Sequence, residues 1–539
     1  MSIALPLQET RAPKTRLASS AIDARGLEKA LKRSVEGEVR FDPGSLGLYA
    51  VDASNYRQVP IGVVIPRTID DVVETVRVSR EFGAPILSRG GGTSLAGQCC
   101  NTAIVMDWSK YLNQVLEIDH VHRRARVRPG CILGNLRHEA EKYGLTFGPD
   151  PATHDHCTLG GMIGNNSCGA HAQMAGPVSH NVESMEVLLY DGTRMTVGWA
   201  TNDEMKNAIR QGGRRGEIMA KLEQLRAKYA TQIQRRFPDI PRRISGYNLD
   251  QLLPSESPDA EGKFNLARAL VGSEGTLVTI LEATLELIHN PPFRTLVVLG
   301  YPDIYKAGDH VPEILKFKPM AFEGIDRMLI ENMKKKELHT KYLDRLPEGN
   351  GWLLIQFPGE TKQEADDRAR QMIDYLKAKR DAPATKLYDD EQDEKAVWKV
   401  RESGLGATAF VPGEPVAWEG WEDAAVPPAA LGDYLRDFSK LLEKYDYKTA
   451  LYGHFGQGCI HCRISFDLMS KKGVQDYRSF VEHAAELVSN YGGSLSGEHG
   501  DGQSRGIAAH HVWQGNRAGI SRVQIHMGSG LENESRKNR

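Results

Sequence analysis

The sequence predicts an α+β protein with two main domains. A strand–helix–strand–loop–strand order lies between residues 61 and 107. The dipeptide Pro291-Pro292 then marks a break, and beyond it strands again alternate with amphipathic helices. A chain of 539 residues is long enough for two or three domains with sizeable cores.

The elements of the first domain follow from apolar patterning and turn signals. Thr68 and Asp71 form a T-x-x-D start signal for a helix, and Asp191-Gly192 is a turn signal between two strands. The predicted strands and hairpins are 61–66, 84–87, 103–107, 115–130 and 184–197, and the predicted helices are 68–82 and 132–143. The segment from about 201 to 266 is rich in charged residues and has a helical pattern, which indicates an insertion in the first domain.

The second domain is predicted to be an α/β substrate or cap domain. Strands are expected at 295–300 and 351–357, and an amphipathic helix at 362–380. The predicted organisation is an N-terminal arm and helix over 1–50, a first domain over 51–290, a second over 291–505 and a tail over 506–539. That tail has no clear apolar periodicity.

The composition excludes several classes of protein. A formal net charge of −2 argues against nucleic-acid binding, and no run of about 18 apolar residues predicts a transmembrane helix. Seven scattered cysteines indicate reduced thiols and not a disulfide framework. We therefore expect a cytoplasmic protein, either free or held peripherally at the inner face of the membrane.

The stretch "SRGGGTSLAGQ", Ser88 to Gln98, is a glycine-rich loop after a predicted strand. It lacks the Gly-Lys-Ser/Thr of a P-loop and the G-x-G-x-x-G spacing of a Rossmann fingerprint. Successive glycines can still present several amides to a pyrophosphate, because glycine reaches positive φ without strain. Taken alone, the loop is explained equally well as a simple turn.

Two further segments share this character, "GPDPATHDHCTLGGMIGNNSCG" at 148–169 and "GSEGTL" at 272–277. Together the three motifs resemble the PCMH-type FAD-binding domain of the vanillyl-alcohol oxidase superfamily. Within it the chain is similar to the FAD-linked 2-hydroxyacid dehydrogenases, which include D-lactate dehydrogenases, the glycolate oxidase flavin subunit and D-2-hydroxyglutarate dehydrogenase. The resemblance covers roughly residues 51 to 505.

The resemblance implies which residues hold FAD. The pyrophosphate would lie against Arg89, Gly90, Gly91, Gly92, Thr93 and Ser94. The flavin and ribityl path would be lined by Pro149, Thr153, Gly160, Gly161, Asn165 and Gly169, and the adenine end or pyrophosphate by Gly275 and Thr276. Some relatives attach FAD covalently through a histidine where this chain has Thr93, so non-covalent FAD is expected.

The second domain carries histidines and a glutamate in glycine-rich surroundings. "YGHFGQGCIH" contains His454 and His461, and "GEHGDGQ" contains Glu498 and His499. Histidine and carboxylate groups can bind a divalent metal, although surface histidines beside an acidic turn are the alternative. The resemblance implies that His454, His461 and Glu498 are ligands of Zn or Mn and that His499 is the general base. An unperturbed histidine pKa of about 6.5 suits that role.

Three further positions concern the substrate. The resemblance implies that Arg401 clamps the substrate carboxylate, and a helix-surface arginine is the alternative. Trp421 stands where several relatives have lysine, which argues against a second bound carboxylate and for a larger apolar or aromatic substrate. Gln457-Gly458-Cys459 replaces the Asp-Gly-Asn that relatives often have.

The resemblance implies a FAD-dependent oxidoreductase that converts a D-2-hydroxy acid, such as D-lactate, to the 2-oxo acid by hydride transfer to flavin. The expected electron acceptor is a quinone, a cytochrome or an iron–sulfur partner. The chain has no C-x-x-C-x-x-C run, so no iron–sulfur cluster is expected in it. The alternatives are an inactive flavin-binding remnant with an altered C-terminus and a metal-dependent hydrolase without flavin.

Overall fold

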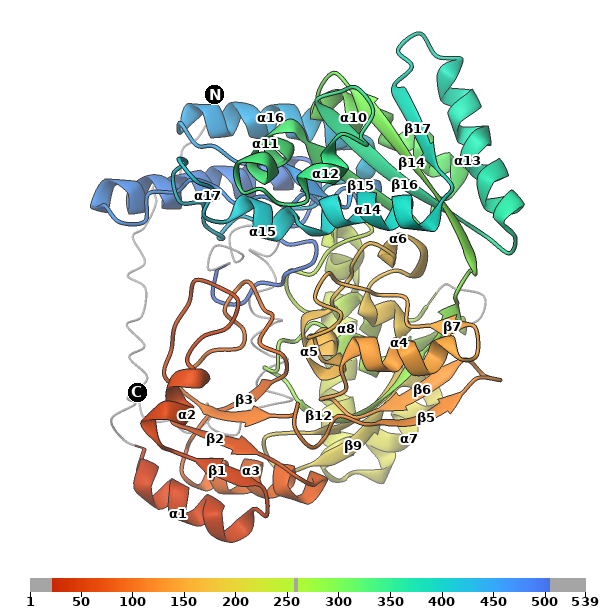
Figure 1. Ribbon diagram of the computed structural model, residues 1–539. Helices are drawn as coiled ribbons and strands as arrows, with labels where there is room; N and C mark the ends of the chain where they lie inside the picture. The colour runs from red at the N-terminus through yellow and green to blue at the C-terminus, as the bar shows by residue number, and fades with distance from the viewer. Residues whose placement is uncertain (1–21, 256–259, 505–539) are drawn as a thin grey trace, which may run out of the picture.

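The computed structural model describes residues 22–255 and 260–504. Figure 1 shows two bodies, with the red-to-yellow elements of the first part of the chain below and the green-to-blue elements above. The chain passes from one to the other between β13 (Ile288–His289) and β14 (Phe293–Tyr301), at the predicted Pro291-Pro292 break. Most of the N-terminal arm and the 506–539 tail lie outside the described residues.

The first sheet has the order β1-β2-β4-β3. Strands β2, β4 and β3 are parallel, and β1 pairs with β2 in the antiparallel sense. Thr68 and Asp71 form the predicted capping box of helix α3. The elements are α1 (Ala24–Ser34), β1 (Glu38–Arg40), α2 (Pro43–Leu48), β2 (Gly62–Ile65), α3 (Ile69–Glu81), β3 (Ile86–Arg89) and β4 (Ile104–Asp107). The glycine-rich loop leaves the end of β3.

The second sheet is antiparallel throughout, in the order β5-β6-β12-β8-β9. Both predicted hairpins form, and Gly192 at the second turn has a φ of 91°, which favours glycine. The strands are β5 (Val115–Asp119), β6 (Arg124–Val127), β8 (Val182–Leu188), β9 (Arg194–Val197) and β12 (Thr279–Glu286), and helices α4 (Leu133–Glu141) and α5 (Leu159–Asn165) lie between them in sequence. Strand β12 is central to the sheet although it comes last, so the segment after the insertion completes the domain.

The segment predicted as an insertion contributes to the core of the first domain. Helix α8 (Gly213–Arg236) buries Ile218, Leu222 and Leu225 in the same cluster as Val182 of β8. The other short elements are β7 (Leu145–Thr146), α6 (Ala172–Ala175), β10 (Trp199–Thr201), α7 (Asn202–Gln211), β11 (Lys263–Asn265) and α9 (Leu266–Leu270). Strands β10 and β11 pair with each other, as do β13 and β7.

The cap sheet has the order β17-β14-β16-β15-β18, and every pair is antiparallel. Helix α10 connects β14 to β15, while the later strand β16 lies between those two. This is the split β-α-β arrangement of ferredoxin-like folds, and it explains how alternating strands and helices form an antiparallel sheet. The elements are α10 (Ile304–Ile314), β15 (Ala321–Asp326), β16 (Gly351–Gly359), α13 (Lys362–Lys377), β17 (Ala384–Tyr388) and β18 (Tyr452–Gly453).

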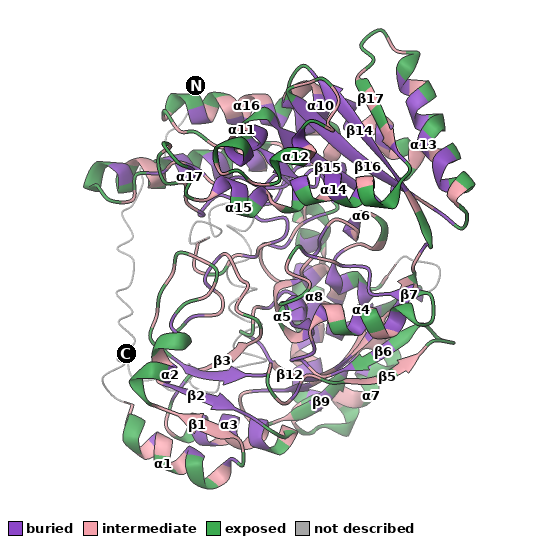
Figure 2. Cartoon of the chain, viewed as in Figure 1, coloured by how far each residue is buried: buried purple, intermediate pink, exposed green. Residues whose placement is uncertain are grey.

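Helices cover both faces of the cap sheet. Side chains alternate along β14, so that Val297 and Leu299 enter one core cluster and Leu296 and Val298 the other. Figure 2 shows the buried central strands beneath helices whose outer faces are exposed. The remaining helices are α11 (Arg327–Lys335), α12 (Thr340–Leu343), α14 (Glu391–Glu402), α15 (Gly404–Thr408), α16 (Leu431–Lys444) and α17 (Lys471–Asn490). No helix in the described part of the chain combines the length and apolar character that a membrane crossing requires.

The last described segment of the cap returns to the first domain. Asp501 accepts hydrogen bonds from Ser245 Oγ at 2.7 Å and the Gly246 amide at 2.8 Å. Gln503 donates to the carbonyl oxygen of Gly97 at 2.6 Å. Glu274 of the first domain accepts from the Gly502 amide at 3.1 Å. These contacts clamp the two domains together beside the glycine-rich loop.

Glu274 makes this clamp sensitive to pH. Burial, and then the neighbouring carboxylate of Asp501, raise the pKa of Glu274 to about 7. A carboxyl whose pKa is raised on folding stabilises the fold below its unfolded pKa, and this contribution is lost as the pH rises through the folded value. The affected window is therefore about pH 4.5 to 7, and the loss is on the order of 1–3 kcal/mol.

We predict that Glu274→Gln flattens the fall in Tm of the parent protein between pH 5 and pH 8. Glutamine keeps the oxygen that accepts from Gly502 and Gln98 but cannot ionise. Thermal unfolding of parent and variant across this pH range is the measurement. Glu486→Gln, on an exposed position of α17, is the control and should follow the parent. Parallel curves for the parent and Glu274→Gln would refute the prediction.

Candidate functional site

The glycine-rich loop 88–98 packs directly against the second loop, 148–169. A Cβ atom on Gly90 would lie 2.0 Å from Thr158 Oγ1, and one on Gly91 would lie 2.2 Å from the carbonyl oxygen of His156. Gly92 has a φ of +68°, a conformation that side chains other than glycine rarely adopt. Glycine is therefore required at Gly90 and Gly91 because the second loop lies too close for a side chain, and at Gly92 because of its positive φ. The loops form a narrow, amide-rich cradle.

This cradle opens into a cavity of about 940 Å³ between the two domains. A contiguous cavity of about 90 Å³ lies behind it and shares several lining residues, among them Gly90 and Gly161. The predicted residues that line the larger cavity are Gly90, Gly91, Gly92, Thr93, Ser94, Thr153, Gly161, Asn165, Gly169, Arg401, His454, His461, Glu498 and His499. Arg89, Gly160 and Gly275 line the smaller one. The predicted flavin loops and the predicted metal motif thus share one space.

Two predicted FAD contacts lie outside both cavities. Pro149 is buried, and Thr276 bonds to Tyr247 Oη at 2.7 Å. Arg89 donates to the Cys99 carbonyl oxygen at 2.9 Å, so its side chain braces the two ends of the glycine loop. The cradle fits a pyrophosphate, because the backbone from Gly90 to Ser94 and the hydroxyl residues Thr93 and Ser94 line the cavity.

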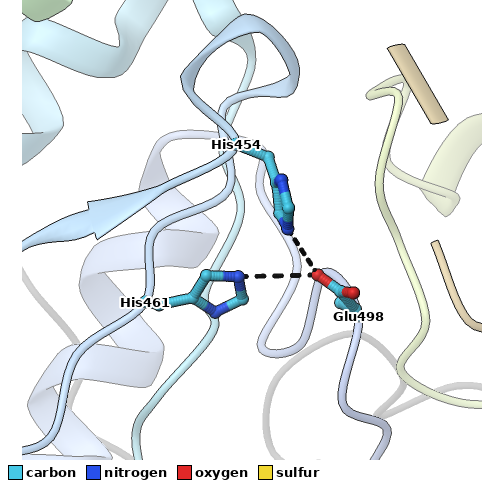
Figure 3. Close-up of side chains that lie close together, drawn as sticks. All are labelled: His454, His461 and Glu498. Atoms are coloured by element: carbon cyan, nitrogen blue, oxygen red, sulfur yellow. Dashed lines mark hydrogen bonds and ion pairs between the residues drawn. The ribbon is translucent and has the colours of Figure 1, made fainter. Parts of the chain in front are cut away.

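The three predicted metal ligands converge on one point (Figure 3). The Nε2 atom of His454 lies 2.8 Å from Glu498 Oε2, and the Nε2 atom of His461 lies 3.5 Å from the same oxygen. One ligand atom from each of the three residues lies within 4.8 Å of the others. Two imidazoles and one carboxylate suit Zn or Mn, and the buried Nδ1 of His461 has no hydrogen-bond partner among the described residues. The donor set therefore fits a divalent metal.

The position of His454 is set by Glu323, a residue of β15 that sequence reasoning missed. Glu323 Oε1 lies 2.7 Å from His454 Nδ1, and Oε2 accepts from Arg401 Nε at 2.7 Å and pairs with Arg401 Nη2 at 2.6 Å. A carboxylate on Nδ1 fixes the tautomer that leaves Nε2 for a metal. Arg401, the predicted partner of the substrate carboxylate, lines the cavity, and two of its nitrogens contact Glu323.

Burial and neighbouring charges strongly shift the pKa values of the side chains in this cluster. Burial alone would raise the pKa of Glu323, but Arg401 and His454 lower it to about 2. His454 and Arg242 likewise hold the pKa of Glu498 well below its usual range against the effect of burial. Burial lowers the pKa of His461 to about 4. At neutral pH the cluster therefore offers ionised carboxylates and a neutral His461, which are the forms that bind metal.

His499 lies beside this cluster, and its ring stacks on His461 with centroids 4.9 Å apart. Burial by itself lowers its pKa, but the carboxylates of Asp423 and Glu422 raise the pKa to about 9. The expectation of an unperturbed pKa was therefore wrong, because two carboxylates behind the ring were not foreseen. Asp423 also accepts from the backbone amides of Glu498 at 2.9 Å and His499 at 2.6 Å, so it holds both residues.

Arg242 is a second site residue that the sequence did not reveal. Its fully buried guanidinium donates to Glu498 Oε2 at 2.8 Å and to Gln457 Oε1 at 2.6 Å. It comes from the segment predicted as an insertion, where it is one of many charged residues. No spacing signal connects it to the histidine motif, so only the tertiary structure identifies it.

The argument from Trp421 about substrate size was wrong. Its side chain is 1% exposed and packs in the cap core, and it does not line the cavity. The loss of lysine at this position therefore does not enlarge the substrate pocket. The cavity instead presents Arg137, Arg294 and Lys362 at the junction of the two domains.

The two domains match two known families of domains. Residues 60–198 match the FAD binding domain, and residues 290–508 match the C-terminal domain of FAD linked oxidases. The fold and the site thus define a two-domain FAD-binding protein. The chain thus carries both domains of the FAD-linked oxidases, and it is similar to dehydrogenases and oxidases of 2-hydroxy acids.

Several relatives are similar over most of the chain. A D-2-hydroxyglutarate dehydrogenase of Pseudomonas putida is 29% identical over 88% of this chain and 48% of its own length. Glycolate oxidase subunit GlcD of Bacillus subtilis is 27% identical over 87% of each chain. A D-lactate dehydrogenase of Archaeoglobus fulgidus is 28% identical over 82% of each. The chain spans about half the length of the D-2-hydroxyglutarate dehydrogenases it matches.

The fold also matches a solved structure. Alkyldihydroxyacetonephosphate synthase superposes with a TM-score of 0.60 at 16% identity, over 93% of this chain and 83% of that chain. This likeness concerns the fold, and it agrees with the predicted α+β class of a FAD-binding domain followed by a cap.

We predict that Gly91→Val purifies with little flavin. The new Cβ would meet the His156 carbonyl oxygen, so the two loops must separate and the amides lose their shared geometry. FAD affinity should fall by about 10-fold or more, which corresponds to about 1.4 kcal/mol. The ratio of flavin to protein absorbance after purification is the measurement. Gly47→Ala, where a Cβ meets nothing within 4 Å, is the control. Full flavin content in Gly91→Val would show that the loop assignment is wrong.

Proposed function

We propose that this protein oxidises a D-2-hydroxy acid to the 2-oxo acid, with non-covalent FAD as hydride acceptor and a divalent metal, Zn or Mn, at His454, His461 and Glu498. The observation that carries the proposal is the single cavity that joins the glycine cradle to these three residues and to His499. A 2-hydroxy acid placed there would have its hydroxyl and carboxylate near the metal ligands and its C2 hydrogen near a flavin held by the cradle.

The two bound groups would supply complementary chemistry. FAD would be held by the glycine cradle and would supply the acceptor for the hydride that leaves C2 of the substrate. His454, His461 and Glu498 would hold a divalent cation, which would supply a lowered pKa of the substrate hydroxyl. The protein's own groups then have three tasks, which are to orient the substrate carboxylate, to accept the hydroxyl proton and to exclude water.

His499 is the proposed proton acceptor. Its ring lies against His461, and Glu422 Oε1 is 3.6 Å from Nδ1. Glu422 and Asp423 stabilise the imidazolium that forms when the proton arrives, as the carboxylate of a catalytic triad does. A cation at the neighbouring metal ligands opposes that charge and favours the neutral, proton-accepting form beforehand.

Arg401 is the proposed partner of the substrate carboxylate. A guanidinium has five N–H donors, and the contacts with Glu323 use its Nε and Nη2 atoms. The side chain lines the cavity and is 10% exposed. It can therefore position Glu323 and still present donors to an anionic substrate.

An anaerobic flavin-bleaching assay tests the proposal. Purified protein with its flavin is mixed with D-lactate or D-2-hydroxyglutarate, and the flavin absorbance is followed, with the L-enantiomers as controls. Bleaching by a D-2-hydroxy acid supports the oxidation. Flavin that no 2-hydroxy acid bleaches would favour the flavin-binding remnant, and protein that never binds flavin would favour the hydrolase.

We predict that His499→Ala keeps its FAD but reduces it about 10²–10⁴-fold more slowly with the best substrate, which is the usual contribution of a positioned general base. Stopped-flow flavin absorbance is the measurement. His454→Ala should instead lose bound metal and also bind substrate more weakly.

His483→Ala is the matched control, because His483 is exposed on α17 and its ring bonds to Tyr445. It should reduce flavin at the parent rate. If His499→Ala also matched the parent rate, His499 would not be the base, even though the family assignment would stand.

A further inference from the structure

Arg242 is a buried cation at the meeting point of three loops. Its Nη1 donates to Glu498 Oε2 at 2.8 Å, its Nε donates to Gln457 Oε1 at 2.6 Å, and its Nη2 donates to the carbonyl oxygen of Gly169. The three acceptors belong to the last cap segment, the histidine motif and the flavin-lining loop. One guanidinium therefore connects these three segments of the proposed site.

The backbone around Arg242 holds this side chain in place. The Ile244 amide donates to the Ser496 carbonyl oxygen at 2.9 Å. Ser245 Oγ and the Gly246 amide both bond to Asp501. The segment that carries Arg242 thus runs along the segment that carries Glu498, and the geometry of the ion pair is set by contacts on both sides of it.

The ion pair controls where the Glu498 carboxylate points. Oε2 faces the Nε2 atoms of His454 and His461, and Arg242 bonds to that same oxygen. The fork of N–H donors is shared among three acceptors, so the bonds to Gln457 and Gly169 fix the guanidinium while Nη1 bonds to the Glu498 carboxylate. Gln457 in turn donates to the Ala172 carbonyl oxygen at 3.0 Å, so the partner of Arg242 is itself held.

We propose that Arg242 is a positioning residue that orients Glu498 as a metal ligand and ties that ligand to the flavin-lining loop through Gly169. This inference rests on the proposed function, because it assumes that His454, His461 and Glu498 bind a divalent metal. Residues that hydrogen-bond to metal ligands typically change metal affinity by about 10–100-fold when they are removed. Arg242 should act in this way on Glu498, as Glu323, which contacts His454 Nδ1, should on His454.

The rival interpretation gives Arg242 the opposite effect. A guanidinium on Glu498 could act as a built-in substitute for a metal cation and repel any metal that enters. In that case its removal would tighten metal binding. The direction of the change in affinity therefore separates the two interpretations.

The test is titration of FAD-loaded protein with Mn²⁺, read from the electron paramagnetic resonance signal of the free aqua ion. Arg242→Ala should bind Mn²⁺ about 10–100-fold more weakly than the parent. Arg242→Lys keeps a charge but loses the fork, so it should lose less affinity. Mn²⁺ should also perturb the flavin absorbance of the parent more than that of Arg242→Ala, because the link through Gly169 is gone.

Arg243→Ala is the matched control. Arg243 is the next residue, and it pairs with Asp250 and lies over the Phe237 ring at 4.8 Å, away from the metal ligands. It should bind Mn²⁺ like the parent. Circular dichroism and flavin content confirm that each variant is folded. Should Arg242→Ala fail to fold, Gln457→Met, which removes one acceptor of the guanidinium, takes its place and should also weaken Mn²⁺ binding.

The outcomes are distinct. Equal or tighter Mn²⁺ binding by folded Arg242→Ala, beside a parent that binds Mn²⁺, overturns the positioning role and leaves the proposed function intact. A parent that does not bind Mn²⁺ overturns the metal site of the proposed function, and this inference with it. Weaker binding in Arg242→Ala with parent-like binding in Arg243→Ala supports the inference.

Discussion

The structure depends on the partners that replace water around one buried carboxylate, that of Glu498. An ion removed from water costs several kcal/mol unless charged or hydrogen-bonding partners replace the solvent. Here the partners come from both domains, with Arg242 from the first and His454 and His461 from the cap. The pairing is complete only when the two domains meet in one arrangement. The same contacts that satisfy this carboxylate therefore place the cap against the flavin loops.

Other contacts around the cavity support the same arrangement. Gln457 reaches from the cap to the Ala172 carbonyl oxygen, Asp501 pairs with the 245–246 backbone, and Gln503 reaches the Gly97 carbonyl oxygen. These bonds surround the space that the glycine cradle and the histidine motif share. Catalysis between a cofactor and a substrate requires such a fixed separation, because small displacements of reacting atoms are costly in rate. The domain contact is thus part of the proposed site.

Much of the fold could be predicted from local signals. The capping box at Thr68 and the turn at Gly192 depend only on neighbouring residues, and both were read correctly from the sequence. The three loop motifs and the histidine motif could also be recognised in the sequence, because each is a short run of residues with its own chemistry. The first two loops and the histidine motif line one cavity, and the third loop lines the smaller cavity beside it, while the role of each residue stays a prediction.

What could not be predicted depends on tertiary packing. Glu323 and Arg242 lie far along the chain from His454 and Glu498, which they contact, and single charged residues carry no periodic signal. The family resemblance suggests a substrate-facing position for Trp421, but the side chain is buried in the cap core. The pKa of His499 was similarly missed, since the carboxylates that raise it sit behind the ring.

The charges of the site form an ordered row, Arg401–Glu323–His454–Glu498–Arg242. Two guanidiniums balance two carboxylates on either side of one imidazole, so the row itself leaves no negative charge for an added divalent cation. A 2-hydroxy acid would bring one negative charge in its carboxylate and a second once its hydroxyl proton has passed to His499. In a buried site such a balance matters, because unpaired charge is poorly screened there. With the proposed metal and substrate, the row would favour both bound together over either one alone, which would be a coupling free energy between two ligands of the same cavity.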